Sequence, residues 1–190
     1  TMTLISDAIK SDHRDLEEAY NNILTAASDD EKRRWQNQFT WELARHSIGE
    51  ELVLYPAMEE HLTDGKAMAD KDRAEHKTVK DHLEKFQNLK PDDAEFIPTL
   101  QGLWGSLSQH IKEEEEQDLV KLEANLDNEV SKAMVSSFKR TKMFVPTRSH
   151  PSAPDKPPFE TVAGLLAAPI DHIRDLFRKF PDQAASDIPP

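Results

Sequence analysis

Two short stretches of this chain share one pattern: His46-Ser47-Ile48-Gly49-Glu50 and His110-Ile111-Lys112-Glu113-Glu114. In each, a glutamate follows a histidine by four residues, so both side chains lie on one helix face and can reach one ion or two adjacent ions. Both pairs lie on a stripe that is otherwise apolar. Ionisable groups that face a core are costly to bury unless they are paired or bind a metal. These two stretches therefore guide the interpretation of the rest of the chain.

Apolar residues recur at steps of three and four around these stretches, which predicts four helices. The expected helices cover about 4–27, 28–64, 68–89 and 91 onward, and the connections between them are short. The second begins with a capping box at Ser28 to Glu31. Short connections favour antiparallel neighbours, so we expect an all-α, up-down four-helix bundle.

Each predicted helix carries one histidine on its inward stripe, and the first and third contribute His13 and His76. Asp72 shares the stripe of His76, and either Asp118 or Lys121 continues the stripe of Glu114. On the second helix, Val53 and Ala57 are expected to continue the stripe of Glu50.

The composition limits the classes of function. The 190 residues include no cysteine, which excludes disulfides, iron–sulfur clusters, thiolate zinc sites and cysteine nucleophiles. A net charge of -12 argues against nucleic-acid binding, which requires a Lys/Arg surface. No stretch approaches the roughly 20 apolar residues of a membrane span, and no secretory signal is visible. We therefore expect a cytoplasmic protein with no transmembrane segment.

The composition changes at about Val145, and nine of the 12 prolines lie from Pro146 onward. We expect two parts: the bundle over 4–140 and a Pro-rich extension over 141–190. The extension should contain a linker and a short amphipathic helix, interrupted by Pro169, over 159–180. We expect this tail to dock on the bundle over one end of the site; a membrane surface or a partner protein is the alternative.

The histidines and glutamates of the stripes predict a metal site of nitrogen and oxygen ligands. A single His-x-x-x-Glu pair is usually a surface pair, but four helices with matched inward groups favour a common site. Imidazole and bridging carboxylate suit iron better than calcium or magnesium. The expected ligands are His13, His46, Glu50, His76, His110 and Glu114.

Some assignments within this set stay open. Glu115 competes with Glu114 as the ligand, and Glu51 could contribute although it points about 100° away from Glu50 on an ideal helix. The other histidines fall near helix ends, off the stripe or in the tail, and surface roles are expected for them: His61, His82, His150 and His172.

The chain resembles the hemerythrin-like, HHE cation-binding family over about residues 4–126. The residues that carry the resemblance are Asp12-His13, His46 to Glu51, Glu75-His76 and His110 to Glu115. The resemblance implies a four-helix bundle that holds two iron ions (Fe2+/Fe3+), joined by an oxo or hydroxo bridge, and that binds or reacts with dioxygen or peroxide. The tail is similar to the extension of fungal members.

One position departs from the oxygen-carrying members, which have a fifth histidine where this chain has Lys80. The departure implies two histidines per metal and an open position on both, so reversible oxygen carriage by the familiar geometry is not expected. Lys80 is expected to reach solvent, with donation to bound peroxide as the alternative.

Three functional interpretations follow. The first is a di-iron protein that binds iron and dioxygen or related reactive species in sensing, storage or detoxification. The second is a di-iron oxygenase or oxidase acting on a small-molecule substrate. The third is a helical interaction protein whose histidines are incidental. The sequence identifies neither catalytic residues nor an oligomeric state.

Overall fold

The computed structural model describes residues 3–150 and 159–182, and in these ranges it is helical with no strand. The prediction of an all-α fold is confirmed for this part of the chain. The helices are α1 (Ile5–Thr25), α2 (Asp29–Gly49), α3 (Tyr55–His61), α4 (Gly65–Gln87), α5 (Phe96–Glu113), α6 (Leu119–Asn125), α7 (Asn128–Phe144) and α8 (Phe159–Asp175). Two π-helical turns connect them: η1 (Glu50–Leu54) joins α2 to α3, and η2 (Glu114–Asp118) joins α5 to α6.

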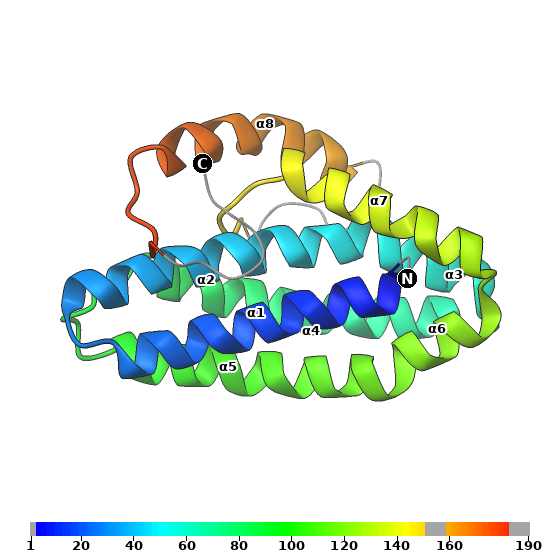
Figure 1. Cartoon of the computed structure of the whole chain (residues 1–190), viewed down its shortest axis with the longest axis horizontal. Helices are drawn as coiled ribbons and strands as arrows, with labels where there is room; N and C mark the ends of the chain where they lie inside the picture. Colours follow the sequence, from blue (N-terminus) through cyan, green and yellow to red (C-terminus); the bar gives the residue numbers. More distant parts are fainter. Residues whose placement is uncertain (1–2, 151–158, 183–190) are drawn as a thin grey trace.

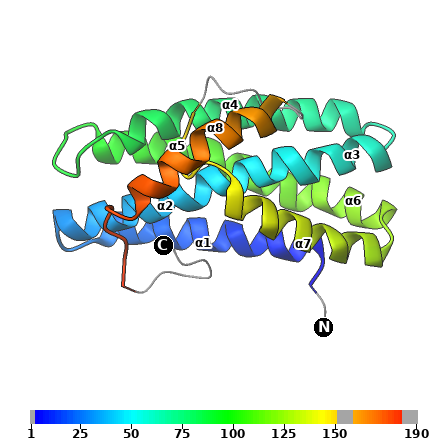
Figure 2. The ribbon, with the colours of Figure 1, turned by 90° about the horizontal axis from the view of Figure 1, so that it is seen from above.

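Long helical rods lie side by side along the molecule (Figures 1 and 2). One rod is α1, the second runs without a break through α2, η1 and α3, the third is α4, and the fourth runs through α5, η2 and α6. Helix α1 packs against α2 and α5, while α4 packs against α5, α3 and α2. Helix α7 crosses over α2, η1 and α1.

Two separate apolar clusters fill the interior between the rods. One contains Leu16, Phe39, Leu43, Val79 and Leu107, and the other contains Ile9, Leu54, Met58, Ala69 and Leu122. Along every rod, the histidine expected as a ligand lies between a member of one cluster and a member of the other. The chain therefore holds a polar layer between two apolar ones.

The π-helical turns shift the inward stripe by one residue. Beyond Glu50 the fully buried apolar side chains are Leu54, Tyr55 and Met58, whereas the expected Val53 and Ala57 are only partly buried. The reason is that a π turn inserts one residue more than an α turn, so the face that follows it is displaced. The same shift places Asp118 inward (8% exposed) and Lys121 in solvent.

Some boundaries differ from expectation for local reasons. The capping at Ser28 is present, because its side chain accepts a hydrogen bond from the Glu31 amide at 3.2 Å. Gly65 does not close the second helix but begins α4. A Cβ atom at Gly65 would lie 1.8 Å from the carbonyl oxygen of Met58, so the α3–α4 corner needs a residue with no side chain.

The described part of the tail is held together and joined to the bundle by polar groups. Within the tail, the Asp171 carboxylate of α8 accepts hydrogen bonds from the amides of Thr147 and Arg148, each at 3.2 Å. Beyond α8, the carbonyl of Lys179 accepts from Asn37 of α2 at 2.8 Å. The expected docking is therefore present, but the contacts beyond α8 are with α2, and α8 lies alongside that helix rather than over an end of the polar layer (Figure 1).

Helix α8 continues through Pro169 instead of breaking there. Its acidic residues Asp171 and Asp175 face inward at 2% exposure, while Ile173 (60%) and Phe177 (85%) face outward. Much of the expected linker, residues 151–158, lies outside the described residues. The division into parts at residue 140 stays a prediction.

Within the described ranges, none of the helices combines the length and apolarity that crossing a membrane requires.

Gly65→Ala should destabilise the protein by about 2 kcal/mol or more, because the added methyl group overlaps backbone that cannot move without opening the α3–α4 corner. Urea denaturation measures the change. The control is Gly105→Ala on the exposed face of α5, where nothing lies within 4 Å of the added atom. This change should stabilise the protein by about 0.5–1 kcal/mol. Equal stability of the two variants would contradict the tight corner.

Candidate metal centre

Four buried histidines meet in the polar layer, one from each rod. His13, His46, His76 and His110 are 0–3% exposed. Their Nε2 atoms turn inward, and those of His76 and His110 lie 3.1 Å apart. Two groups each place their ligand atoms within 4.8 Å of one another: His13, His46 and Glu50, and Glu50, His76 and His110. The two groups share Glu50.

Glu50 lies between the two histidine pairs. Its Oε1 is 3.1 Å from Nε2 of His46 and 3.9 Å from Nε2 of His13, while its Oε2 is 3.2 Å from Nε2 of His76. Glu114 enters from the other side, with Oε2 3.3 Å from Nε2 of His13. Glu50 thus faces both histidine pairs, and Glu114 faces His13.

Five of the inward atoms lack hydrogen-bond partners. Both carboxylate oxygens of Glu50, both of Glu114 and Nε2 of His13 are buried and make no hydrogen bond. Buried polar atoms without partners are rare and need an explanation. Cations bound by the imidazole nitrogens and carboxylate oxygens would satisfy them, so the residues fit a metal centre.

The outward nitrogen, Nδ1, of every one of these histidines contacts a carboxylate of a neighbouring rod. Asp12 of α1 lies 3.1 Å from His46 of α2, and Glu51 of η1 lies 3.0 Å from His76 of α4. Glu75 of α4 lies 2.8 Å from His110 of α5, and Glu115 of η2 lies 2.8 Å from His13 of α1. The four contacts form a closed ring around the bundle, which we call the carboxylate–histidine ring. Such contacts select the tautomer that leaves Nε2 free for a metal.

A basic side chain lies behind each carboxylate of the ring. The pairs are Lys142 with Asp12 at 2.7 Å, Lys80 with Glu51 at 2.6 Å, Lys71 with Glu75 at 3.4 Å and Arg14 with Glu115 at 2.6 Å. Lys142 comes from α7, so this helix also supports the centre. Lys80 is 14% exposed and held by Glu51, which differs from the expectation that it reaches solvent.

The ring reveals a repeat that the sequence analysis did not identify. An acid–histidine pair followed by His-x-x-x-Glu-Glu occurs once in α1, α2 and η1 and again in α4, α5 and η2. The repeat extends to the backbone, because each π turn begins at the first glutamate of its Glu-Glu pair, Glu50 in one half and Glu114 in the other. π turns occur frequently at functional sites.

Electrostatics tie the protonation of the histidines to the charge of Glu50. Burial disfavours the charged imidazole, but Glu50 and Asp12 raise the pKa of His46 to about 10. Likewise, burial opposes but Glu50 and Glu51 raise the pKa of His76 to about 9. Protons on these rings and a bound cation are alternative ways to offset the same negative charge.

Acidic side chains lie beside the centre on one side. Asp72 is 2% exposed, and burial together with Asp118 and Glu114 raises its pKa to about 8. Burial and Glu114 raise the pKa of Asp118 to about 6. A third group with ligand atoms within 4.8 Å of one another consists of Asp72, Glu75 and His110.

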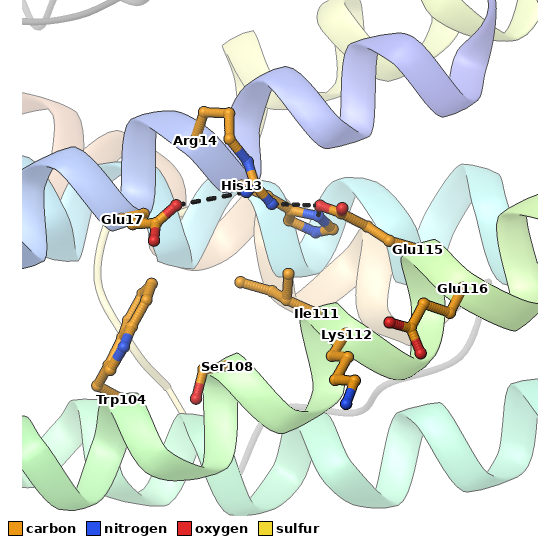
Figure 3. Close-up of a pocket in the computed structure, with 9 residues that line it drawn as sticks. All are labelled: His13, Arg14, Glu17, Trp104, Ser108, Ile111, Lys112, Glu115 and Glu116. Atoms are coloured by element: carbon orange, nitrogen blue, oxygen red, sulfur yellow. Dashed lines mark hydrogen bonds and ion pairs between the residues drawn. The ribbon is translucent and has the colours of Figure 1, made fainter.

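A surface groove of about 260 Å³ reaches the centre between α1 and α5. Figure 3 shows that His13 and Arg14 line it from α1, whereas Trp104, Ser108 and Lys112 line it from α5. The side chain of Arg14 bonds Glu115, which itself contacts Nδ1 of His13. The groove therefore opens beside one of the proposed ligands, His13.

The structure brings together all six residues expected from the sequence, with Glu114 fully buried and the Glu115 side chain outside it at 23% exposure. Sequence reasoning missed the carboxylate partners, although Asp12 and Glu75 directly precede inward histidines. The other histidines lie away from the centre; His150 contacts Asp171 at 2.9 Å and His172 contacts the Val145 carbonyl.

Comparisons with known proteins agree with this geometry. The chain is 59% identical over 181 residues to an uncharacterised hemerythrin-like protein of Schizosaccharomyces pombe, covering 95% of this chain and 89% of that protein. It is 24% identical over 144 residues to a DNA nickase of Nostoc, covering 76% of this chain and 40% of that protein. The expectation that this acidic chain binds no nucleic acid stays a prediction. No solved structure matches the chain significantly.

The model of the hemerythrin HHE cation binding domain matches residues 4–122, which include all four inward histidines and both inward glutamates. The chain belongs to the hemerythrin HHE cation-binding family.

Proposed function

We propose that this protein is a non-haem di-iron protein that binds dioxygen or related reactive species in sensing, storage or detoxification. The observation that carries the proposal is the position of Glu50, whose two oxygens face different histidine pairs. His13 and His46 would hold one iron, and His76 and His110 the other, with Glu50 and Glu114 between them. The scaffold is an up-down four-helix bundle, supported by the contacts between successive rods.

The donor set supports iron. Imidazole with bridging carboxylate suits transition metals, whereas calcium and magnesium prefer oxygen ligands alone. When bound, two irons can exchange two electrons with dioxygen or peroxide. The residues around the centre would orient and hydrogen-bond the reactant: the hydroxyl of Tyr55, fully buried, lies 2.8 Å from Nε2 of His76 and places an O–H group beside the centre.

Lys80 argues against reversible oxygen carriage. It does not supply a fifth ligand, because its ammonium pairs with Glu51 and thereby supports His76 from outside. With two histidines for each metal, both ions would have room for exchangeable ligands.

A di-iron oxygenase or oxidase is the second candidate, and the groove between α1 and α5 favours it. The groove is large enough for a small molecule and reaches His13. Under this alternative, Ser108→Trp would fill the groove and suppress substrate-dependent oxygen uptake, while iron content stays at the wild-type level. Oxygen uptake by the reduced protein that no tested substrate alters would count against the enzyme.

The purified protein, loaded with Fe2+ under anaerobic conditions, should contain about two irons per chain by elemental analysis. Glu50→Gln should lower the content, because Glu50 is the group shared by both halves of the centre. His61→Ala is the matched control, since His61 lies on the surface away from the site and its loss should leave the content unchanged. Iron content near zero in the wild type would favour a helical interaction protein instead.

Glu51→Gln should weaken iron binding by about 10- to 100-fold, because it removes the charge that orients His76 and pairs with Lys80. Competition with a calibrated chelator measures the affinity. Asp81→Asn serves as the control, because Asp81 pairs with Lys77 on the surface, outside the carboxylate–histidine ring. Equal affinity of both variants would show that the carboxylate–histidine ring does not tune the metal.

A further inference from the structure

The two halves of the repeat differ at the positions one helical turn beyond the ligands. Four residues before His13 stands Ile9, whereas four residues before His76 stands Asp72. Four residues after Glu50 stands Leu54, whereas four residues after Glu114 stands Asp118. Ile9 and Leu54 are fully buried in an apolar cluster, so the shared architecture itself does not need acids at these positions.

Asp72 is a buried carboxylate with an unpartnered oxygen, as expected for a metal ligand. It is 2% exposed, and its Oδ2 atom is buried without a hydrogen-bond partner. Its ligand atom lies within 4.8 Å of those of Glu75 and His110. Leaving a buried carboxylate oxygen without a partner is costly, so a further group is expected to satisfy it.

The surroundings of Asp72 lead from the surface to the centre. The Glu75 side chain is 31% exposed and meets the ammonium of Lys71. A positive charge of the protein itself therefore lies at the solvent end of these carboxylates. Asp118, at 8% exposure on η2, lies one turn beyond Glu114, and both charges act on Asp72. His110 holds Oε2 of Glu75 through its Nδ1, so Asp72, Asp118 and Oε1 of Glu75, which now meets Lys71, can bind an additional ion.

The geometry points to a third cation site, formed by Asp72, Glu75 and Asp118, through which divalent ions reach the dinuclear centre. Its oxygen donors suit Fe2+ or Mn2+. A chain of carboxylates that ends at Glu114 would concentrate cations and pass them inward, displacing Lys71 from Glu75 on the way. The transfer step rests on the proposed dinuclear function, whereas binding at the third site does not.

The first measurement uses Mn2+ alone and counts bound ions in the full chain. The wild type should bind three ions, with the third the weakest, and crystals soaked in Mn2+ should show an anomalous peak between Asp72 and Asp118. Asp72→Asn should bind two. Asp81→Asn is the control, since Asp81 is an exposed acid of the same helix paired with Lys77, and it should bind three.

The second measurement follows the filling of the centre by limiting Fe2+ under anaerobic conditions, with optical stopped-flow detection. Asp72→Asn and Asp118→Asn should each slow filling by about tenfold, because local concentration of ions at the path is lost. An unchanged ion count or an unchanged filling rate in these variants overturns the proposal. If Asp72→Asn does not fold, the filling rate of Asp118→Asn and the anomalous peak in the wild-type crystal test the proposal.

Glu50→Gln separates this proposal from the proposed function. It should abolish the paired ions and leave the Mn2+ at Asp72 in place. A wild type that binds a single ion, lost in Asp72→Asn, would refute the dinuclear centre and the transfer step together. A wild type with two ions that are both lost in Glu50→Gln would refute the third site alone.

Discussion

The carboxylate–histidine ring is the constraint on which the arrangement of this protein depends. Each rod gives one histidine to the interior and one carboxylate to the histidine of the next rod, and the fourth rod returns to the first through Glu115 and His13. A rotation of any rod would break two of these contacts, because it moves both a histidine and a carboxylate. The ring therefore ties the packing of the helices to the direction of the four Nε2 atoms.

The ring also explains how a bundle can bury so many charges. The polar layer lies between two apolar clusters, which supply the hydrophobic stabilisation that the layer itself lacks. Buried charges are tolerated when they are paired, and the chain pairs each outward nitrogen while leaving the inward atoms of Glu50 and Glu114 without partners. The unpartnered inward carboxylates lower stability at the proposed ligands, which is typical of functional sites.

The sequence was sufficient for the helices and the six inward residues, since both follow from local periodicity and from the four-residue spacing of His46 and Glu50. It did not reveal the partners in the ring, because each contact joins two different rods whose rotation is set by tertiary packing. It predicted that the tail docks but not which face of α8 turns inward: Asp171 is buried and Ile173 is exposed, contrary to what an amphipathic pattern predicts. The amide groups of Thr147 and Arg148 explain that reversal, because they need the carboxylate as an acceptor.

The π-helical turns at Glu50 and Glu114 have a consequence for comparing homologues. Since each turn holds one residue more than a regular helix needs, a relative could lose that residue and keep the same rods, with Tyr55 or Leu119 moving one position closer to the glutamate. An alignment without gaps would then equate buried residues of one protein with exposed residues of the other. A single-residue gap just after a His-x-x-x-Glu motif should thus be interpreted as a change of helix geometry, not as loss of the metal centre.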